Sequence, residues 1–253
     1  MPLNPGQAIG SEIKGGVLSG IVGLVGSGEY LPSMLEVEGR LIAGRSPVYV
    51  QVPTAASLEG QKRVQYWIGL GLAQAERLGV KAVPLMILDR DSANDKKVLE
   101  PINEAGLIYF SGGSPSHLIS TIEGTLLQDL VFKAFDRGAA VAGCSAGAMA
   151  LGTYSLGFHG MVPKIQNGLG LAPNVAILPH FDRFRNRVTD TILKRSTQSL
   201  GGVWLIGVDE ETALIGSDAT YEVMGKGSAW VISRDGFKRY ASGETIEVKV
   251  VEN

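Results

Sequence analysis

The sequence is poor in the residue types that form disulfides or bind metals. Its 253 residues include one cysteine and three histidines. An intrachain disulfide is therefore excluded, and no group of histidines and cysteines has the spacing of a metal site. We expect neither a metal nor an organic cofactor. A chain without disulfides suits a reducing compartment, so we expect a cytoplasmic protein.

Long apolar runs and an excess of one charge are also missing. No segment approaches the ~20 apolar residues that a membrane helix requires. Residues 1–16 lack the hydrophobic centre of a signal peptide and are expected to form a loose leader. The 23 basic and 25 acidic residues are interspersed and give a net charge of -2. Binding to nucleic acid or to a membrane surface is therefore not expected, and a small peptide or a carboxylated small molecule is the expected substrate.

Short apolar runs alternate with longer amphipathic ones over the first 150 residues. Because such alternation is typical of βαβ units, it predicts an α/β fold with a mostly parallel open sheet and helices on both faces. With 45% hydrophobic residues, the length fits one domain over 1–253. The expected strands are Val17–Val25, Val48–Val52, Val80–Leu88, Leu107–Phe110 and Ala139–Ala142, and the expected helices are Pro32–Ala43, Leu58–Leu78, Ser92–Asn103 and Pro115–Arg137.

The pattern changes after Pro173, where a strand at Val175–Leu178, a helix at Arg185–Leu200 and a strand at Val203–Val208 are expected. Glycine turns then separate short apolar runs, which predicts extra antiparallel strands near the C-terminus. These are Thr212–Ile215, Tyr221–Met224, Ala229–Ile232 and Thr245–Val251. Residues 212–253 would form a C-terminal β-layer, which is a candidate surface for a homodimer.

The most informative motif follows the apolar run Ala139–Ala142. The segment Gly143-Cys144-Ser145-Ala146-Gly147-Ala148 has a serine between two glycines, at the expected junction of a strand and a helix. Small flanking residues permit the sharp turn of a nucleophile elbow, so Ser145 is a candidate nucleophile for acyl transfer. The backbone N–H groups of Gly113 and Ala146 would stabilise the oxyanion. Cys144, one residue before the apex, is interpreted as inert packing.

A serine nucleophile needs a base, and His180 follows the expected strand Val175–Leu178. His159 is the competing base, but we expect its glycine-rich stretch, Gly152–Gly160, to form a mobile loop. The segment Gly207-Val208-Asp209-Glu210-Glu211-Thr212 supplies carboxylates after another strand. The order serine, histidine, acid differs from that of α/β-hydrolases, which disfavours an esterase of that fold unless an acid between the two is used. Asp182 is a rival acid, but it is badly placed two residues after His180.

Four segments together resemble the cyanophycinase and dipeptidase E family of serine peptidases. They are Tyr109-Phe110-Ser111-Gly112-Gly113, the elbow Gly143–Ala148, His180-Phe181, and Gly207–Leu214; the Gly26-Ser27-Gly28-Glu29 turn adds weaker support. The resemblance implies a fold like that of class I glutamine amidotransferases. It also implies that Ser145 is the nucleophile, His180 the general base and Glu210 the orienting acid, with Glu211 as its rival, and that Gly113 lends an oxyanion-hole N–H.

Substrate recognition is less clearly encoded. Arg183, Arg185 and Arg187 could clamp a substrate carboxylate, and Ser114 and His117 could approach the substrate. The family's polar residues are replaced here by Ser114-Pro115 and Leu178-Pro179, which disfavours cyanophycin itself as the substrate. The sequence thus predicts a serine hydrolase of peptide or related amide bonds. The alternatives are an esterase or amidase of a small carboxylated metabolite, and a catalytically silent binding protein.

Overall fold

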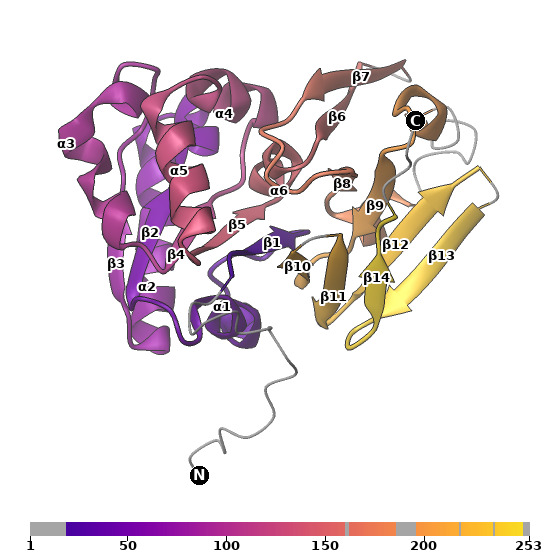
Figure 1. The fold of residues 1–253 in the computed structure, drawn as a ribbon, viewed down its shortest axis with the longest axis horizontal. Coiled ribbons are helices and arrows are strands. Elements are labelled where there is room, and N and C mark those ends of the chain that lie inside the picture. Colours follow the sequence, from indigo (N-terminus) through magenta and orange to yellow (C-terminus); the bar gives the residue numbers. More distant parts are fainter. Residues whose placement is uncertain (1–18, 160–161, 186–195, 218, 235, 250–253) are drawn as a thin grey trace, which may run out of the picture.

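The computed structural model describes residues 19–159, 162–185, 196–217, 219–234 and 236–249. Within them, an eight-stranded sheet has the strand order β14-β11-β10-β1-β5-β4-β2-β3, and a four-stranded sheet has the order β13-β12-β9-β8 (Figure 1). A two-stranded hairpin, β6-β7, forms a third sheet. The α/β class and the mostly parallel open sheet are confirmed.

Five parallel strands form one half of the large sheet. They are β1 (Ile21–Val25), β2 (Val48–Val52), β3 (Lys81–Pro84), β4 (Leu107–Phe110) and β5 (Ala140–Cys144). In the register of the central strands, Val25 is opposite Cys144, and Phe110 is opposite Gly143. The loops that follow β1, β4 and β5 therefore meet at one edge of the sheet, which is where open parallel sheets bind their ligands.

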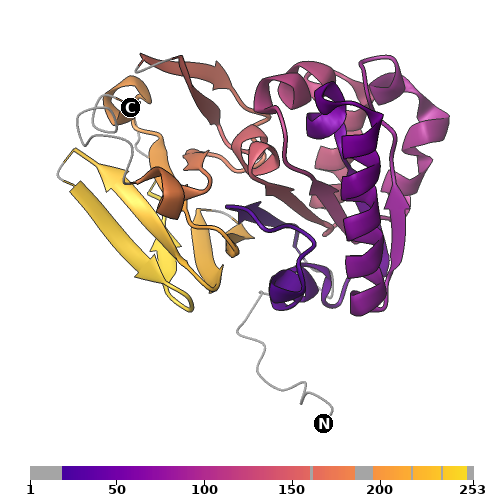
Figure 2. The same cartoon turned by 180° about the vertical axis from the view of Figure 1, so that it is seen from behind.

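Helices cover both faces of this sheet because its strand residues alternate between two apolar clusters. One cluster joins Tyr49, Tyr109 and Ala142 to α1 (Leu35–Ile42) and α2 (Gln61–Leu78), on the face turned to the viewer in Figure 2. The other joins Val50, Ile108 and Val141 to three helices on the face seen in Figure 1. These are α4 (Pro115–Ile122), α5 (Leu126–Asp136) and α6 (Ala146–Leu151).

The strands of the expected C-terminal layer are divided between the two sheets. β10 (Thr212–Ser217), β11 (Thr220–Gly225) and β14 (Thr245–Glu247) extend the large sheet in antiparallel fashion. β12 (Ser228–Ser233) and β13 (Gly236–Ala241) instead continue the small sheet beyond β9 (Trp204–Val208) and β8 (Val175–Leu178). The chain changes sheets at Gly225, whose φ of +113 is a conformation that favours glycine.

Several expected helices are shorter or interrupted. The expected helix at Pro115–Arg137 breaks into α4 and α5 around Gly124, which has a φ of +69. The expected helix at Ser92–Asn103 is reduced to a four-residue α3 (Lys96–Leu99) between 3-10 turns, because Pro101 lacks the N–H that a helix interior needs. The strand expected at Val80–Leu88 ends at Pro84. Most of the helix expected at Arg185–Leu200 lies outside the described residues, although 196–199 are helical.

The prediction of a mobile loop at Gly152–Gly160 is wrong. Tyr154–His159 forms β6, which pairs in antiparallel fashion with β7 (Val162–Asn167). Leu156 is buried and packs in a third apolar cluster with Leu178 and Phe181. Apolar residues at every second position, Tyr154, Leu156 and Phe158, are the pattern that predicts a strand. The glycines in this stretch favoured a loop instead.

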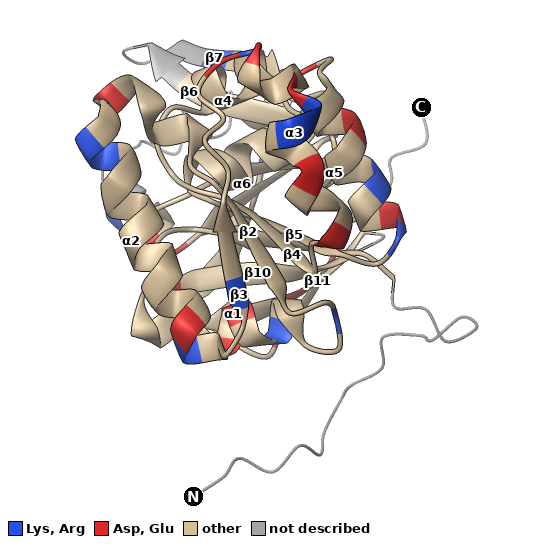
Figure 3. Cartoon of the chain, turned by 90° about the vertical axis from the view of Figure 1, so that its left-hand side faces the viewer, with Lys and Arg blue, Asp and Glu red and all other residues tan. Residues whose placement is uncertain are grey.

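Acidic and basic positions are interspersed over α2, α3 and α5 (Figure 3), as expected for a nearly neutral chain. Among the described residues, no helix combines the length and the apolar character needed to cross a membrane.

The cluster beneath α1 and α2 contains a buried acid. Glu38 is fully buried, and it accepts hydrogen bonds from the Tyr30 N–H (3.0 Å) and the Tyr49 hydroxyl (2.8 Å). Burial raises the pKa of Glu38 from 4.5 to about 7, because the apolar surroundings disfavour the carboxylate. The two hydrogen bonds oppose this effect only in part.

The Glu38 carboxyl should make the folded protein less stable as pH rises. The folded state holds the proton more tightly than the unfolded state, so the contribution of Glu38 to stability is fully present below pH 4.5 and is lost as pH rises through about 7. We expect Glu38→Gln to gain up to about 3 kcal/mol relative to the wild type at pH 8. Urea denaturation at pH 5 and pH 8 measures this. The exposed Glu36→Gln on the same helix is the control, and an unchanged pH dependence in Glu38→Gln would refute the assignment.

Candidate active site

Ser145 lies at the apex of a sharp turn between β5 and α6. Its backbone has φ 49 and ψ -107, a conformation that non-glycine residues rarely adopt. A Cβ on Gly143 would overlap the backbone of Gly147, and a Cβ on Gly147 would overlap the carbonyl of Phe110. The two glycines therefore allow β4, β5 and α6 to approach closely enough to hold the serine in this strained turn.

The two sheets meet at Ser145. The Ser145 N–H donates to the Val25 carbonyl (2.9 Å), which ties the elbow to the end of β1. The loop after β1 contacts the turn between β9 and β10, since the Glu211 N–H donates to the Ser27 carbonyl (3.1 Å). In the small sheet, β8 and β9 run parallel with Leu178 opposite Gly207. The residues that follow these two strands therefore lie beside the serine.

Three of the predicted residues form a chain of hydrogen bonds. The Ser145 Oγ lies 3.0 Å from the His180 Nε2, and the His180 Nδ1 lies 2.7 Å from the Glu210 Oε1. An ionised carboxylate can only accept, so Nδ1 carries the proton and the Nε2 lone pair faces the Ser145 hydroxyl. The His180 side chain is 42% exposed and that of Glu210 is 20% exposed. Ser145 and His180 line a pocket that Glu210 does not reach, so the serine end of the chain is open to a substrate.

His180 is held by the residue that follows it. His180 has left-handed backbone angles (φ 52, ψ 36) and precedes the short helix α7 (Phe181–Phe184). The Phe181 ring is fully buried and occupies the space where Gly207 lacks a side chain. A Cβ at Gly207 would collide with this ring, so the glycine fixes the position of Phe181 and, through it, that of the imidazole.

Glu210 is fixed on both sides. Its second oxygen, Oε2, pairs with the Arg183 guanidinium at 2.7 Å. Its backbone N–H donates to the Asp182 Oδ1 at 3.0 Å. Asp182 therefore orients the backbone of Glu210, while Arg183 pairs with its carboxylate.

The neighbouring acids have other partners. The Glu211 carboxylate pairs with the Lys226 ammonium at 2.6 Å, and this contact lowers the pKa of Glu211. Asp209 accepts hydrogen bonds from the Ser228 N–H (2.9 Å) and the Trp230 indole N–H (3.0 Å). Of the three consecutive acids, Glu210 is the one that contacts His180.

The buried carboxylate of Glu29, which was not among the predicted site residues, links the elbow strand to the glycine loop after β4. Glu29 accepts the Gly112 N–H on Oε1 (2.9 Å) and the Cys144 thiol on Oε2 (2.8 Å). Burial, reinforced by the Glu29 charge, raises the pKa of Cys144 and keeps the thiol protonated. Cys144 is thus a hydrogen-bond donor as well as packing. The turn Gly26–Glu29 was noted as weak support for the resemblance, but nothing in it indicated this contact.

The glycine loop faces Ser145. A Cβ on Gly112 would lie 3.5 Å from the Ser145 Cβ, and Gly113 has a φ of +142, a conformation open mainly to glycine. Ala146 is the first residue of α6, so its N–H has no acceptor within the helix. The two backbone groups predicted for an oxyanion hole therefore belong to the glycine loop after β4 and to the first residue of α6.

A pocket of about 370 Å³ opens beside Ser145 and His180. Its other wall is formed by the loop after β1, by Glu59 just before α2, and by α2 itself. The side chains on this wall are Leu31, Glu59, Arg63, Tyr66, Trp67 and Leu70. The sequence predicts a helix at Leu58–Leu78, but nothing in its pattern indicated that one side of it would face Ser145.

The other predicted substrate-binding residues do not line this pocket. Ser114 caps α4 by accepting the His117 N–H (3.3 Å), and the His117 Nε2 lies 2.7 Å from the Ser57 Oγ. The Arg185 guanidinium stacks over the Trp230 ring at 4.4 Å, in a separate hollow. Arg187 lies outside the described residues.

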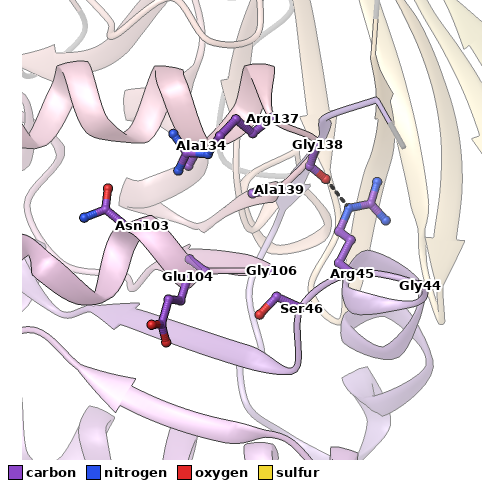
Figure 4. A pocket seen from close by; sticks show the side chains of 11 residues that line it. Gly44, Arg45, Ser46, Asn103, Glu104, Gly106, Ala134, Arg137, Gly138 and Ala139 are labelled. Carbon is purple, nitrogen blue, oxygen red and sulfur yellow. Dashed lines mark hydrogen bonds between the residues drawn. The ribbon is translucent and has the colours of Figure 1, made fainter. Parts of the chain in front are cut away.

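A larger hollow, of about 630 Å³, lies at the opposite edge of the sheet, before β2, β4 and β5 (Figure 4). The Arg45 Nε donates to the Gly138 carbonyl there (2.8 Å), and its NH1 and NH2 donate to other carbonyls. The lining contains no pairing of a nucleophile with a base. In the described part of the chain, no group of three or more His, Cys, Asp or Glu could hold a metal ion.

Comparisons with known proteins give the class to which this fold belongs, which is that of the peptidases. The model of peptidase family S51 matches residues 23–224. A crystal structure of a peptidase from an acI-B1 Actinobacterium is 36% identical, covers 92% of this chain and 98% of its own, and has a TM-score of 0.82. A putative Peptidase E protein from Listeria monocytogenes EGD-e shares the fold, at 15% identity, 83% and 100% coverage and a TM-score of 0.57.

The chain belongs to peptidase family S51. This confirms the resemblance to the cyanophycinase and dipeptidase E family. Because of this family membership, the protein is a peptidase of the hydrolase class. A search of curated proteins found no match to the chain.

Proposed function

We propose that the protein cleaves peptide bonds through an acyl-enzyme formed on Ser145, with His180 as general base and Glu210 as the acid that orients it. The hydrogen bonds from the Ser145 Oγ to the His180 Nε2 (3.0 Å) and from the His180 Nδ1 to Glu210 (2.7 Å) carry the proposal. A nucleophile, a base and an orienting carboxylate in this sequence of contacts are the elements of a serine-hydrolase triad.

The first half-reaction transfers the acyl group to the enzyme. As the Ser145 Oγ bonds to the substrate carbonyl carbon, His180 takes the hydroxyl proton on Nε2. His180 then gives this proton to the amide nitrogen, the C–N bond breaks, and the amine leaves. In the second half-reaction His180 takes a proton from water, the water oxygen bonds to the acyl carbon, and Ser145 regains its proton as the acid product leaves.

The charges around the triad suit this sequence of events. The imidazolium that forms in each half-reaction is stabilised by Glu210, whose second oxygen stays paired with Arg183. The N–H groups of Gly113 and Ala146 are the proposed donors to the oxyanion. Each donor of this kind contributes about 10²- to 10³-fold in rate in enzymes that use acyl transfer.

The first prediction separates the two serine–histidine contacts of the molecule. We expect Ser145→Ala to reduce kcat on the order of 10⁶-fold, because no other group can form the acyl-enzyme. Ser57→Ala removes the hydroxyl that contacts His117 at 2.7 Å, and it should leave kcat within about threefold of wild type. Hydrolysis of a tetrapeptide library, followed by mass spectrometry, measures both. Equal losses in the two variants would contradict the assignment.

The second prediction identifies the third member of the triad. Glu210→Gln should lower kcat about 10⁴-fold, because the amide no longer fixes the tautomer or stabilises the imidazolium. Glu211→Gln breaks an exposed pair with Lys226 and should change kcat by less than about threefold. Kinetics on one peptide substrate with both variants measure the difference. A larger loss in Glu211→Gln would transfer the role to that residue.

A further inference from the structure

The pocket beside Ser145 has an aromatic wall that the catalytic groups do not use. Tyr66 is 52% exposed and Leu31 is 38% exposed, although both are large apolar side chains. Trp67 supports this wall from behind, with its ring 5.2 Å from that of Tyr66 and 6.4 Å from that of the buried Tyr30. The wall is therefore a largely apolar surface left open to solvent within the same pocket as the nucleophile.

The basic side chain of this pocket is already engaged. The Arg63 Nε lies 3.2 Å from the Glu59 Oε2, one helical turn away. The Arg63 guanidinium also lies 4.9 Å from the centre of the Trp67 ring and 5.3 Å from that of Tyr66. Arg63 is thus neutralised by Glu59 and extends the aromatic wall, since guanidinium planes stack on aromatic faces.

The remaining charges near the serine offer little to an ionised side chain. Glu29 is occupied by Gly112 and Cys144. Arg183 pairs with Glu210, and Arg185 stacks on Trp230 in another hollow. Glu59 lies against Arg63, so a substrate carboxylate in this pocket would meet a negative charge beside the guanidinium, whereas an uncharged ring needs only apolar surface.

We infer that the α2 wall is a specificity subsite for an uncharged, aromatic or large aliphatic side chain of the peptide substrate. This inference rests on the proposed function and names the substrate class of the same pocket. The side chain would pack on Tyr66, Trp67 and Leu31, with Arg63 covering the contact and Glu59 excluding a competing carboxylate. The continuity of the wall with Ser145 and His180 places such a side chain next to the scissile bond.

Tetrapeptides with free termini, carrying Phe or Asp at each position in turn among alanines, test the inference. We expect the best Phe peptide to exceed the best Asp peptide about tenfold in kcat/KM. Tyr66→Ala should abolish most of this preference by raising KM for the Phe peptide. Leu72→Ala is the matched control, because Leu72 is 45% exposed on the same helix but does not line the pocket. A preference for Asp in the wild type would overturn the inference.

The Arg63–Glu59 pair provides a second, opposite test. Glu59→Gln frees the guanidinium, and it should raise kcat/KM for Asp peptides several-fold while leaving the Phe peptides little changed. If Glu59→Gln has no effect on Asp peptides, Arg63 does not face the substrate and its part in the subsite is wrong.

Binding separates the subsite from the proposed chemistry. Calorimetric titration of Ser145→Ala with the same peptides reads the subsite without turnover. If no peptide is hydrolysed by the wild type but Phe peptides bind more tightly than Asp peptides, and Tyr66→Ala removes the difference, the proposed function fails and the subsite stands. Equal binding of the two series overturns the subsite, whatever the turnover.

Discussion

The strained turn at Ser145 is the constraint on which the rest of the site depends. A serine with φ 49 is unfavourable by about 1–3 kcal/mol unless its surroundings enforce it. Here Gly143 and Gly147 let β4, β5 and α6 close around it, and the hydrogen bond from Ser145 to Val25 ties it to β1. The same register brings the glycine loop after β4 and the buried Glu29 to the elbow, so one backbone conformation positions three loops.

The small sheet positions the two residues that form the hydrogen-bond chain with Ser145. His180 and Glu210 follow parallel strands that belong to the small sheet, and the contacts between Ser27 and Glu211 join its edge to the large one. Glycines again permit the close packing, since Phe181 fills the space above Gly207 and fixes His180. The nucleophile and its base thus come from different sheets. Their distance of 3.0 Å depends on how the sheets pack against each other.

The sequence predicted those parts of the fold that local patterns encode. The strands β2 and β4 match their expected bounds, because each is a buried apolar run between turn residues. The break at Gly124 and the hairpin β6-β7 were missed, because glycine in a helical pattern or a strand pattern is ambiguous without its φ angle. The division of β10 to β14 between two sheets depends on contacts between distant segments, which periodicity does not encode.

For the site, too, the sequence predicted residues in local motifs but not contacts between distant segments. The elbow, His180 and the acidic segment were visible as motifs after strands, and the choice between Glu210 and Glu211 needed the direction of their side chains. Glu29 and the α2 wall could not be inferred because their proximity to Ser145 arises from the packing of β1 and α2 against β4 and β5. Arg183 was predicted to contact a substrate, and its pairing with Glu210 could not be inferred, because it depends on the packing of α7 beside the turn after β9.

The central claim is that Ser145 is the residue that becomes acylated. The most direct measurement is to react the wild-type protein with a fluorophosphonate, digest it and locate the adduct by mass spectrometry. The account predicts one adduct, on Ser145, which is absent from the Ser145→Ala variant and forms far more slowly in a variant that lacks the His180 imidazole. An adduct on Ser57, or none on any serine, would contradict it.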